Sequence, residues 1–236
     1  MRNYIVYNGK SFLDFGVFIS GSGTYNAPER DASKVEIPGK NGNLTIDNGR
    51  YKNLTVKYPA FVVSNFSENI EALRNYLLTQ TGYVRLEDTY HPDEYRLGKI
   101  SGGFTTKPVA QLIAGEFDLE FDCYPQRFLK SGEAAVKYTA AGTIINKYLT
   151  EAKPLIRAYG TGSFSIGGVA VQILAADGYT DIDSDLQEAF KDTLATNCNA
   201  NIVLTNGVFP TLKAGSNAIT LSGITKLEIT PRWWVL

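Results

Sequence analysis

Residues 39–59 read GKNGNLTIDNGRYKNLTVKYP, and the rest of the chain is organised around this stretch. Leu44 and Ile46 alternate with polar residues in its first half, and Leu54, Val56 and Tyr58 do so in its second half. An alternation with a period of two residues is typical of a half-buried strand. We therefore predict that the two halves form a β-hairpin.

The length of the loop in this hairpin can be inferred from which face of each strand carries the apolar residues. A two-residue Asn48-Gly49 turn would put the apolar residues of the two halves on opposite faces. A three-residue loop, Asp47 to Gly49 with Gly49 in the left-handed conformation, gathers them on one face. We predict the three-residue loop.

The composition favours a β-rich globular protein. The 236 residues include 14 tyrosines, 12 phenylalanines and 22 glycines, enough for one large domain or two smaller ones. Lysine and arginine total 23 against 24 acidic residues, so the net charge is -1. This balance argues against a non-specific nucleic-acid surface and against a basic membrane-binding face. Cys123 and Cys198 make no disulfide framework, and both are expected to be reduced.

The beginning of the chain carries no sign of export. Residues 1–9 read MRNYIVYNG, which has no long apolar run after its arginine, and no later run is long enough to span a bilayer. We expect a protein made in a cytosol and kept there unless assembly carries it out.

One helix is predicted in the N-terminal half, over about residues 67–81. Asn65 and Glu68 can form its capping box, and Gly82 is expected to end it. Its apolar residues fall on one stripe, namely Phe66, Ile70, Leu73 and Leu77. The helix is expected to lie across the open face of a sheet.

The remaining N-terminal segments are predicted as strands and one long loop. Residues 4–19 are predicted as a hairpin about Asn8-Gly9, and residues 83–90, 95–105 and 109–124 as strands. Residues 21–33 are too polar and glycine-rich for an element, and two interpretations stay open. They form either a floppy surface loop or an arm that a neighbouring copy or a partner orders.

The alternation breaks near residue 130, where we place a boundary between an N-terminal domain, 1–130, and a C-terminal domain, 131–236. The second domain consists of short strands between glycine and asparagine turns. Residues 163–173 form a hairpin about Gly167-Gly168 in the simple two-residue register. Further strands are predicted at 202–204, 218–221 and 227–230. The expected fold is mainly β: an N-terminal barrel-like or split sheet with one helix, and a C-terminal jelly-roll or galectin-like β-sandwich.

The residue inventory predicts no catalytic, cofactor-binding or metal-binding site. His91, the only histidine, lies in a turn with no serine or cysteine placed beside it, so we expect an ordinary surface histidine. Asp118, Glu120 and Asp122 form a carboxylate ladder along one strand, which is interpreted as a solvated face. No glycine-rich phosphate loop or paired-cysteine metal motif occurs.

Two further motifs were weighed for binding. Asp181, Asp183 and Asp185 resemble a calcium loop, but the glycine and the final glutamate of that motif are missing. We predict instead a strand over 179–183 and a capping box of Ser184 with Gln187, opening a helical turn that buries Leu186 and Phe190. Trp233-Trp234 cannot form one flat sugar platform, because adjacent strand residues face opposite sides. At least one is expected to pack inside the sandwich, and the other is a candidate for the domain junction.

Five motifs keep their order along the whole chain: PGKNG at 38–42, DNGRY at 47–51, CYPQRF at 123–128, IDSD at 182–185 and PRWW at 231–234. In this order they resemble the distal tail protein family of long-tailed bacteriophages. The resemblance implies a hexameric ring at the tail tip, whose N-terminal domains close the ring while the C-terminal sandwich holds other tail proteins. It also implies partners, namely further copies of itself, the tail tube protein, a tail-associated or tail fibre protein, and receptor-binding or baseplate proteins.

The sequence bears on three classes of function. A structural hub of the virion, made in the bacterial cytoplasm and carrying no cofactor, agrees with the resemblance and with the edges that β-domains offer for assembly. The alternative is a carbohydrate-binding module contacting host cell-wall glycans. An enzyme has little support in the residue inventory. For the ring we expect contributions from the first hairpin, from residues 21–33 and from strand edges between Val35 and Ile46.

Overall fold

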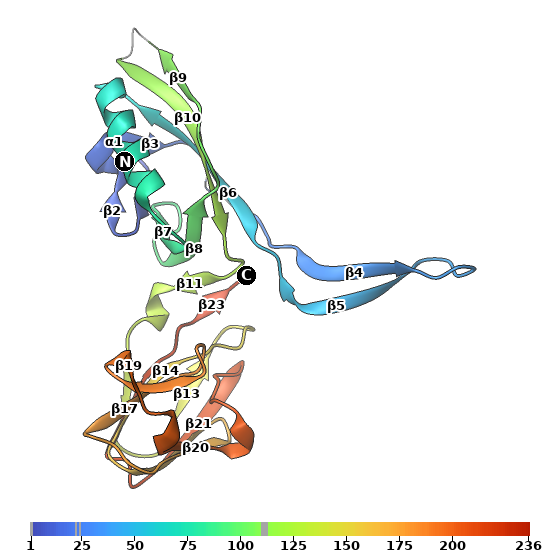
Figure 1. Ribbon diagram of the computed structural model, residues 1–236, viewed down its shortest axis with the longest axis vertical. Helices are drawn as coiled ribbons and strands as arrows, with labels where there is room; N and C mark the ends of the chain where they lie inside the picture. Colours follow the sequence, from blue (N-terminus) through green and yellow to red (C-terminus); the bar gives the residue numbers. More distant parts are fainter. Residues whose placement is uncertain (1, 22, 24, 110–112) are drawn as a thin grey trace. The chain divides into compact units, whose positions relative to one another are not determined.

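The computed structural model describes residues 2–21, 23, 25–109 and 113–236, and strands dominate it (Figure 1). The chain divides into two compact units, Met1–Arg127 with Leu236, and Phe128–Val235. Each unit has a hydrophobic core of its own. The mainly β fold predicted from the sequence is confirmed.

Unit 1 is built on one antiparallel sheet in the order β2-β1-β7-β8-β10-β6-β3, with β9 also paired to β10. Its elements are β1 (Ile5–Tyr7), β2 (Lys10–Ser11), the 3₁₀ turn η1 (Phe12–Phe15), β3 (Val17–Ile19), β4 (Arg30–Glu36), β5 (Asn43–Tyr51), β6 (Leu54–Val62), α1 (Phe66–Thr79), β7 (Val84–Asp88), β8 (Glu94–Ile100), β9 (Thr106–Val109) and β10 (Ala114–Cys123). A bridge between Asn3 and Ile19 links the two ends of the sheet. The sheet is therefore curled, as the predicted barrel-like domain requires.

Helix α1 covers the inner face of this sheet. Its predicted stripe is confirmed, since Phe66, Ile70, Leu73 and Leu77 are all buried in the core of unit 1. The Phe66 ring lies so close to Gly115 of β10 that a Cβ atom at Gly115 would come within 2.2 Å of a ring carbon. The glycine thus allows the helix to approach the sheet closely.

Both predicted ends of α1 are wrong in detail. The Asn65 side chain makes no capping hydrogen bond, because Asn65 itself is left-handed, with φ of 48°. The helix stops at Thr79, and the Gln80 N–H donates to the Leu77 carbonyl, so Gly82 lies beyond the cap. The helix itself needs neither signal, since its apolar stripe determines where it packs.

The predicted hairpin of residues 39–59 is also wrong. β5 and β6 do not pair; β5 pairs with β4, whereas β6 pairs with β10 and β3. Gly49 is left-handed as predicted, with φ of 74°, but it forms a bulge within β5 and its N–H donates to the Asp47 carboxylate. The segment that pairs with β5 had too few apolar residues to be recognised as a strand.

Three other N-terminal predictions need correction. The loop predicted over 21–33 includes the first residues of β4. The hairpin about Asn8-Gly9 exists, but its second arm ends at Ser11, and β3 pairs with β6 instead. The strand predicted over 109–124 corresponds to β10, which begins at Ala114 and pairs antiparallel with β9, and residues 110–112 lie outside the described residues.

Unit 2 is a sandwich of two antiparallel sheets around a shared core. One sheet has the order β12-β22-β14-β17-β18-β19 and the other the order β13-β21-β15-β16-β20. The elements are β11 (Arg127–Leu129), η2 (Lys130–Gly132), β12 (Val136–Tyr138), β13 (Gly142–Asn146), β14 (Leu155–Tyr159), β15 (Gly162–Ile166), β16 (Val169–Ile173), β17 (Tyr179–Asp183), β18 (Glu188–Lys191), β19 (Thr193–Asn197), η3 (Asn199–Asn201), β20 (Ile202–Leu204), η4 (Thr205–Gly207), β21 (Gly215–Ser222), β22 (Lys226–Thr230) and β23 (Trp234–Val235). The predicted hairpin about Gly167-Gly168 is confirmed, with Phe164 opposite Val171 and Ile166 opposite Val169.

The helical turn predicted after Asp183 is wrong. β17 and β18 form a hairpin there, with Gln187 in the left-handed conformation and Leu186 about half exposed. The Asp183 carboxylate accepts hydrogen bonds from the N–H groups of Asp185 and Leu186, so an aspartate and not Ser184 organises the turn.

Candidate interaction surfaces

The two strands β4 and β5 form an arm, residues 30–51, that belongs to no other sheet (Figure 1). Their register places Val35 opposite Leu44 and Ser33 opposite Ile46. Because directly paired residues share a face and neighbours along a strand do not, the arm has two unlike faces. Val35, Leu44 and Ile46 fall on one of them, with Ile37 directly after β4, whereas Lys34, Glu36, Asn43, Thr45 and Asp47 fall on the other.

The apolar face of the arm is open to solvent. The four aliphatic residues are 40–49% exposed, and none of them belongs to the core of unit 1. An isolated two-stranded hairpin is marginally stable in water, and its apolar face is stabilised only by further packing. The arm is therefore a surface that is suited to contact with another chain.

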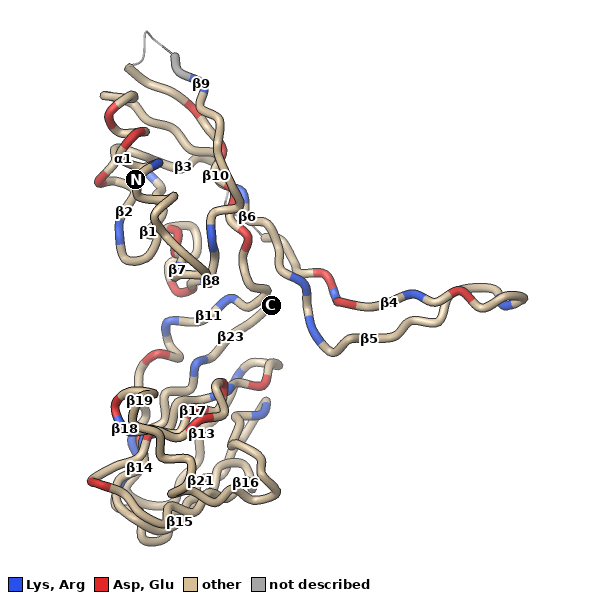
Figure 2. Tube along the Cα trace, in the orientation of Figure 1, with Lys and Arg blue, Asp and Glu red and all other residues tan. Residues whose placement is uncertain are grey.

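Ion pairs hold the base of the arm. Asp47 accepts from the Arg30 guanidinium at 2.9 Å, and Asp31 is 2.6 Å from the Arg50 guanidinium. These hydrogen bonds lower the pKa of both carboxyl groups. Arg30 also lies 4.8 Å over the Tyr51 ring. Figure 2 shows that acidic and basic residues alternate along the arm, so neither sign dominates it.

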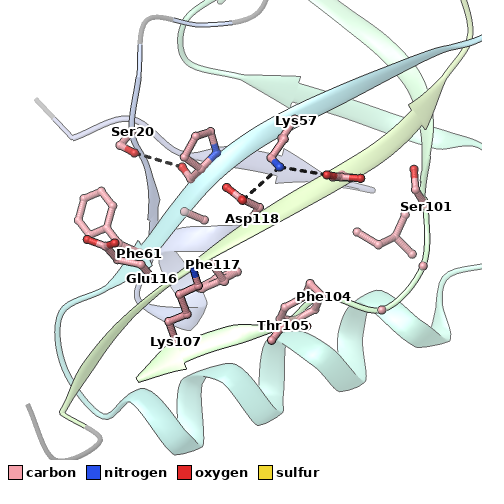
Figure 3. Close-up of a pocket in the computed structure, with 16 residues that line it drawn as sticks. Ser20, Lys57, Phe61, Ser101, Phe104, Thr105, Lys107, Glu116, Phe117 and Asp118 are labelled. Atoms are coloured by element: carbon pink, nitrogen blue, oxygen red, sulfur yellow. Dashed lines mark hydrogen bonds and ion pairs between the residues drawn. The ribbon is translucent and has the colours of Figure 1, made fainter. Parts of the chain in front are cut away.

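A groove of about 750 Å³ lies on the outer face of β6 and β10 (Figure 3). Its floor pairs Lys57 with Glu120, Pro59 with Asp118, and Phe61 with Glu116 across the two strands. The segment 101–105, with Lys107 after it, forms one wall, and Ser20 lies at the other side. The floor of the groove thus mixes apolar and charged residues, with a carboxylate opposite each of Lys57, Pro59 and Phe61.

The predicted carboxylate ladder of β10 lies partly in this groove. Phe117, Leu119 and Phe121 point into the core, while Asp118, Glu120 and Asp122 line the outer face. The Lys57 ammonium is 3.2 Å from both Asp118 and Glu120, which raises the lysine pKa. Within the described part of the chain, no group of acidic, histidine or cysteine residues is arranged to hold a metal ion.

His91 occupies the predicted turn, but it is not a surface residue, since its side chain is only 17% exposed. Its Nδ1 is 3.1 Å from Asp88 Oδ1, and the Tyr58 hydroxyl donates to Asp88 Oδ2 at 2.7 Å. Burial, together with the neighbouring Asp88, raises the pKa of Tyr58 well above its usual value. The Tyr25 ring packs edge-on against the imidazole at 5.2 Å. These contacts join Tyr25 and Tyr58 to the turn at 88–91.

The aspartates that resemble a calcium loop are bound by arginines instead. Asp181 accepts two hydrogen bonds from Arg157 at 2.7 and 2.8 Å, and Asp183 accepts two from Arg232 at 2.8 Å. Each carboxylate is almost fully buried, and each is neutralised by a guanidinium group in the bidentate geometry. Asp185 contacts Lys153 at the surface.

The two tryptophans both pack in unit 2, but they differ in burial and in their contacts. Trp233 is buried in the core of unit 2, and Trp234 in β23 donates its indole N–H to the Glu151 carbonyl.

Elsewhere in unit 2, Tyr159 and Tyr179 form a ring pair. The Lys226 ammonium lies 3.8 Å over the Tyr159 ring, and the Arg157 guanidinium lies 4.2 Å over the Tyr179 ring. The strands of the five-stranded sheet contain no charged residue, which Figure 2 shows as uncoloured tube at β15, β16 and β21.

No helix within the described residues combines the length and apolar character needed to cross a membrane.

No family model matches the sequence, and no curated protein matches it. The structural comparison is more informative. The Dit protein of phage SPP1, described as a paradigm of the hub adsorption apparatus in phages that infect Gram-positive bacteria, superposes over 100% of both chains with a TM-score of 0.73 and 17% identity.

The chain shares its fold with the SPP1 Dit protein. Chains of the activated phage P2 baseplate, solved with Ca and with Sr, also match, with TM-scores of 0.56 and 10% identity. These matches cover 97% of this chain and 96–97% of theirs. The resemblance found in the sequence is thus confirmed at the level of the hub fold.

Proposed function

We propose that this protein is a structural component of a bacteriophage tail baseplate, and that its copies close into a ring that forms the tail-tip hub. The shared fold along the full chain supports the baseplate role. The number of copies, six, and the connection of the tail tube to a receptor-binding apparatus follow from the family resemblance. The virion is then the site of function, and the cytoplasm of the host bacterium is the site of synthesis.

The uncovered apolar face of the arm is the observation that carries the ring proposal. A closed ring needs a heterologous contact, in which one surface of a copy meets a different surface of the next. The arm provides the first of these surfaces, because its four aliphatic residues are exposed in the single chain. The net charge of -1 agrees with a lumen that lets nucleic acid pass without holding it.

The ring is tested by changing the apolar face of the arm. We expect the unaltered protein to form a closed ring at high concentration, visible by negative-stain microscopy and measured by size-exclusion chromatography with light scattering. The double variant Leu44→Lys, Ile46→Lys should remain monomeric with unchanged far-UV circular dichroism. The matched control Thr45→Lys changes the polar face of the same strand and should still form the ring.

Two results would contradict the proposal. One is an unaltered protein that stays monomeric at high concentration and also in the presence of the tail tube protein. The other is a double variant that assembles as well as the control does. Either result would show that the exposed aliphatic residues do not serve assembly.

A further inference from the structure

A small cavity lies beside His91 in unit 1. Its volume is about 20 Å³, Val56 and Leu86 form its apolar wall, and the rest of its lining is polar or charged. We infer that this cavity binds one halide ion, with Arg96 and His91 as the hydrogen-bond donors. The inference does not depend on the proposed ring.

The guanidinium group of Arg96 is the feature that calls for a ligand. Arg96 lies opposite Leu86 in the pairing of β8 with β7, and only 9% of it is exposed. Its side chain makes no hydrogen bond or ion pair with any described residue, and its Nη1 is fully buried. Burial lowers the pKa of Arg96, but a guanidinium group stays protonated in proteins. Because a buried charge without a partner is costly, an acceptor is expected against Nη1.

The neighbouring side chains do not neutralise Arg96. Glu94 is already paired with Arg127 at 3.1 Å. The Cys123 thiol is uncharged, since burial raises its pKa to about 12. The Tyr58 hydroxyl is uncharged as well, because burial raises its pKa well above the usual value. None of these groups supplies the missing negative charge.

The carboxylate of Asp88 is committed to the turn that carries His91. Its Oδ1 is 3.1 Å from His91 Nδ1 and accepts from the backbone N–H groups of Tyr90 and His91, and its Oδ2 accepts from the Tyr58 hydroxyl. His91 Nε2 is buried and has no hydrogen-bond partner among the described residues. An imidazolium ring donates from both of its nitrogens. His91 can therefore donate to Asp88 with Nδ1 and to a ligand in the cavity with Nε2.

Charge and size both favour a monatomic anion. A ligand that accepts from Arg96 and His91 faces two cationic donors, which argues against a metal ion. A cavity needs about 10–15 Å³ to hold one water molecule, so this cavity has room for one small group but not for phosphate or sulfate. A water molecule would satisfy the donors and leave Arg96 without a counter-charge. With a halide the charges balance, since Arg96 and His91 face Asp88 and the halide, and Arg127 faces Glu94.

Halide binding should be linked to the protonation of His91. The imidazole is faced by two carboxylates, two guanidinium groups and three phenols, namely Asp88, Glu94, Arg96, Arg127, Tyr25, Tyr58 and Tyr95. Among these kinds of side chain and histidine, histidine is the one that ordinarily changes charge between about pH 5 and 8. The affinity for halide should therefore rise as the pH falls through this range.

The line width of the chloride NMR signal tests the site directly, because chloride that exchanges with a protein site gives a broader line than free chloride. We expect the unaltered protein to broaden the line, bromide to remove the excess width by competition, and sulfate at equal ionic strength to leave it. Arg96→Met should abolish the excess width. Lys99→Met is the matched control, because it removes an exposed cation from the same strand outside the cavity, and it should keep the excess width.

A second variant tests the other donor, even where Arg96→Met fails to fold. His91→Gln places an amide donor there at any pH, so its excess line width should not change between about pH 6 and 8, whereas that of the unaltered protein should grow at the lower pH. An excess width that is absent from the unaltered protein, or equal in folded Arg96→Met and Lys99→Met, would overturn the inference and leave water as the partner of Arg96. An unchanged pH dependence in His91→Gln would overturn the role of His91. None of these results bears on the ring.

Discussion

At the scale of the residue, the buried carboxylate of Asp183 shows how this protein holds charge in its interior. Burial acts to raise the Asp183 pKa, but hydrogen bonds from the Arg232 guanidinium and from the N–H groups of Leu186 and Asp185 outweigh it. The pKa is therefore lowered. Removing one partner of a buried pair leaves the other charge uncompensated, which is more costly than never having had the pair.

This arrangement predicts a pH dependence of stability. A lowered folded-state pKa gives a contribution that is complete above the ordinary value of 3.8 and is lost as the pH falls below it. In urea unfolding between pH 5 and 2.5, the unaltered protein should lose more free energy of unfolding than Asp183→Asn does. The exposed Asp185→Asn variant should follow the unaltered protein. Parallel curves for all three proteins would contradict this expectation.

A second residue-scale prediction concerns the glycine beneath the helix. Gly115→Val would place side-chain carbons inside the Phe66 ring, so helix or sheet must move. Overpacking of this kind costs about 1–3 kcal/mol of unfolding free energy. Gly103→Ala is the control, because a Cβ there meets nothing within 4 Å. Denaturant unfolding that shows equal stability for both variants would disprove the close approach.

At the scale of the element, the arm should add little to the stability of unit 1. Arg30 and Tyr51 are paired at its base, so residues 31–50 can be replaced by Asn-Gly without breaking the sheet. We expect the shortened protein to unfold with a free energy within about 1 kcal/mol of the original, because the removed residues are largely exposed. It should not assemble. Loss of the native circular dichroism would show that the arm is part of the fold.

The elements that could be predicted from the sequence are those that pair with a neighbouring segment of the chain or that bury an apolar face. The stripe of α1, the alternation of Phe117, Leu119 and Phe121 in β10, and the glycine turn between β15 and β16 all carry such a signal. β4 lacks it, since it begins with charged and small residues and buries no face. The one available sign was the alternation of Val35 and Ile37 with Lys34 and Glu36.

The candidate surfaces were harder to predict than the elements. Pro59 and Phe61 read as ordinary strand residues, and only the pairing of β6 with β10 places them beside Glu116 and Asp118. The assignment of Leu44 and Ile46 to a buried face failed for the same reason. A period of two shows that a strand has unlike faces, but it does not show whether the apolar face meets the same chain or another one.

At the scale of the whole molecule, the two units should fold independently. Their cores share no residue, with the first formed by residues 5–123 and the second by residues 129–233. We expect a fragment of residues 128–236 to show a cooperative thermal transition and a native β spectrum. A fragment that stays unfolded would contradict this expectation and the domain boundary predicted near residue 130.

The near-continuity of β5 and β6 has a mechanical consequence. β6 lies between β10 and β3, so the chain that forms the arm continues directly into a strand that is hydrogen-bonded on both sides. Ladder hydrogen bonds lie across the strands, so a pull along the arm loads many of them at once in shear. A pull on the tip of the arm would therefore be resisted by many hydrogen bonds of the unit 1 sheet together, and the arm could carry load without the strand peeling away one bond at a time.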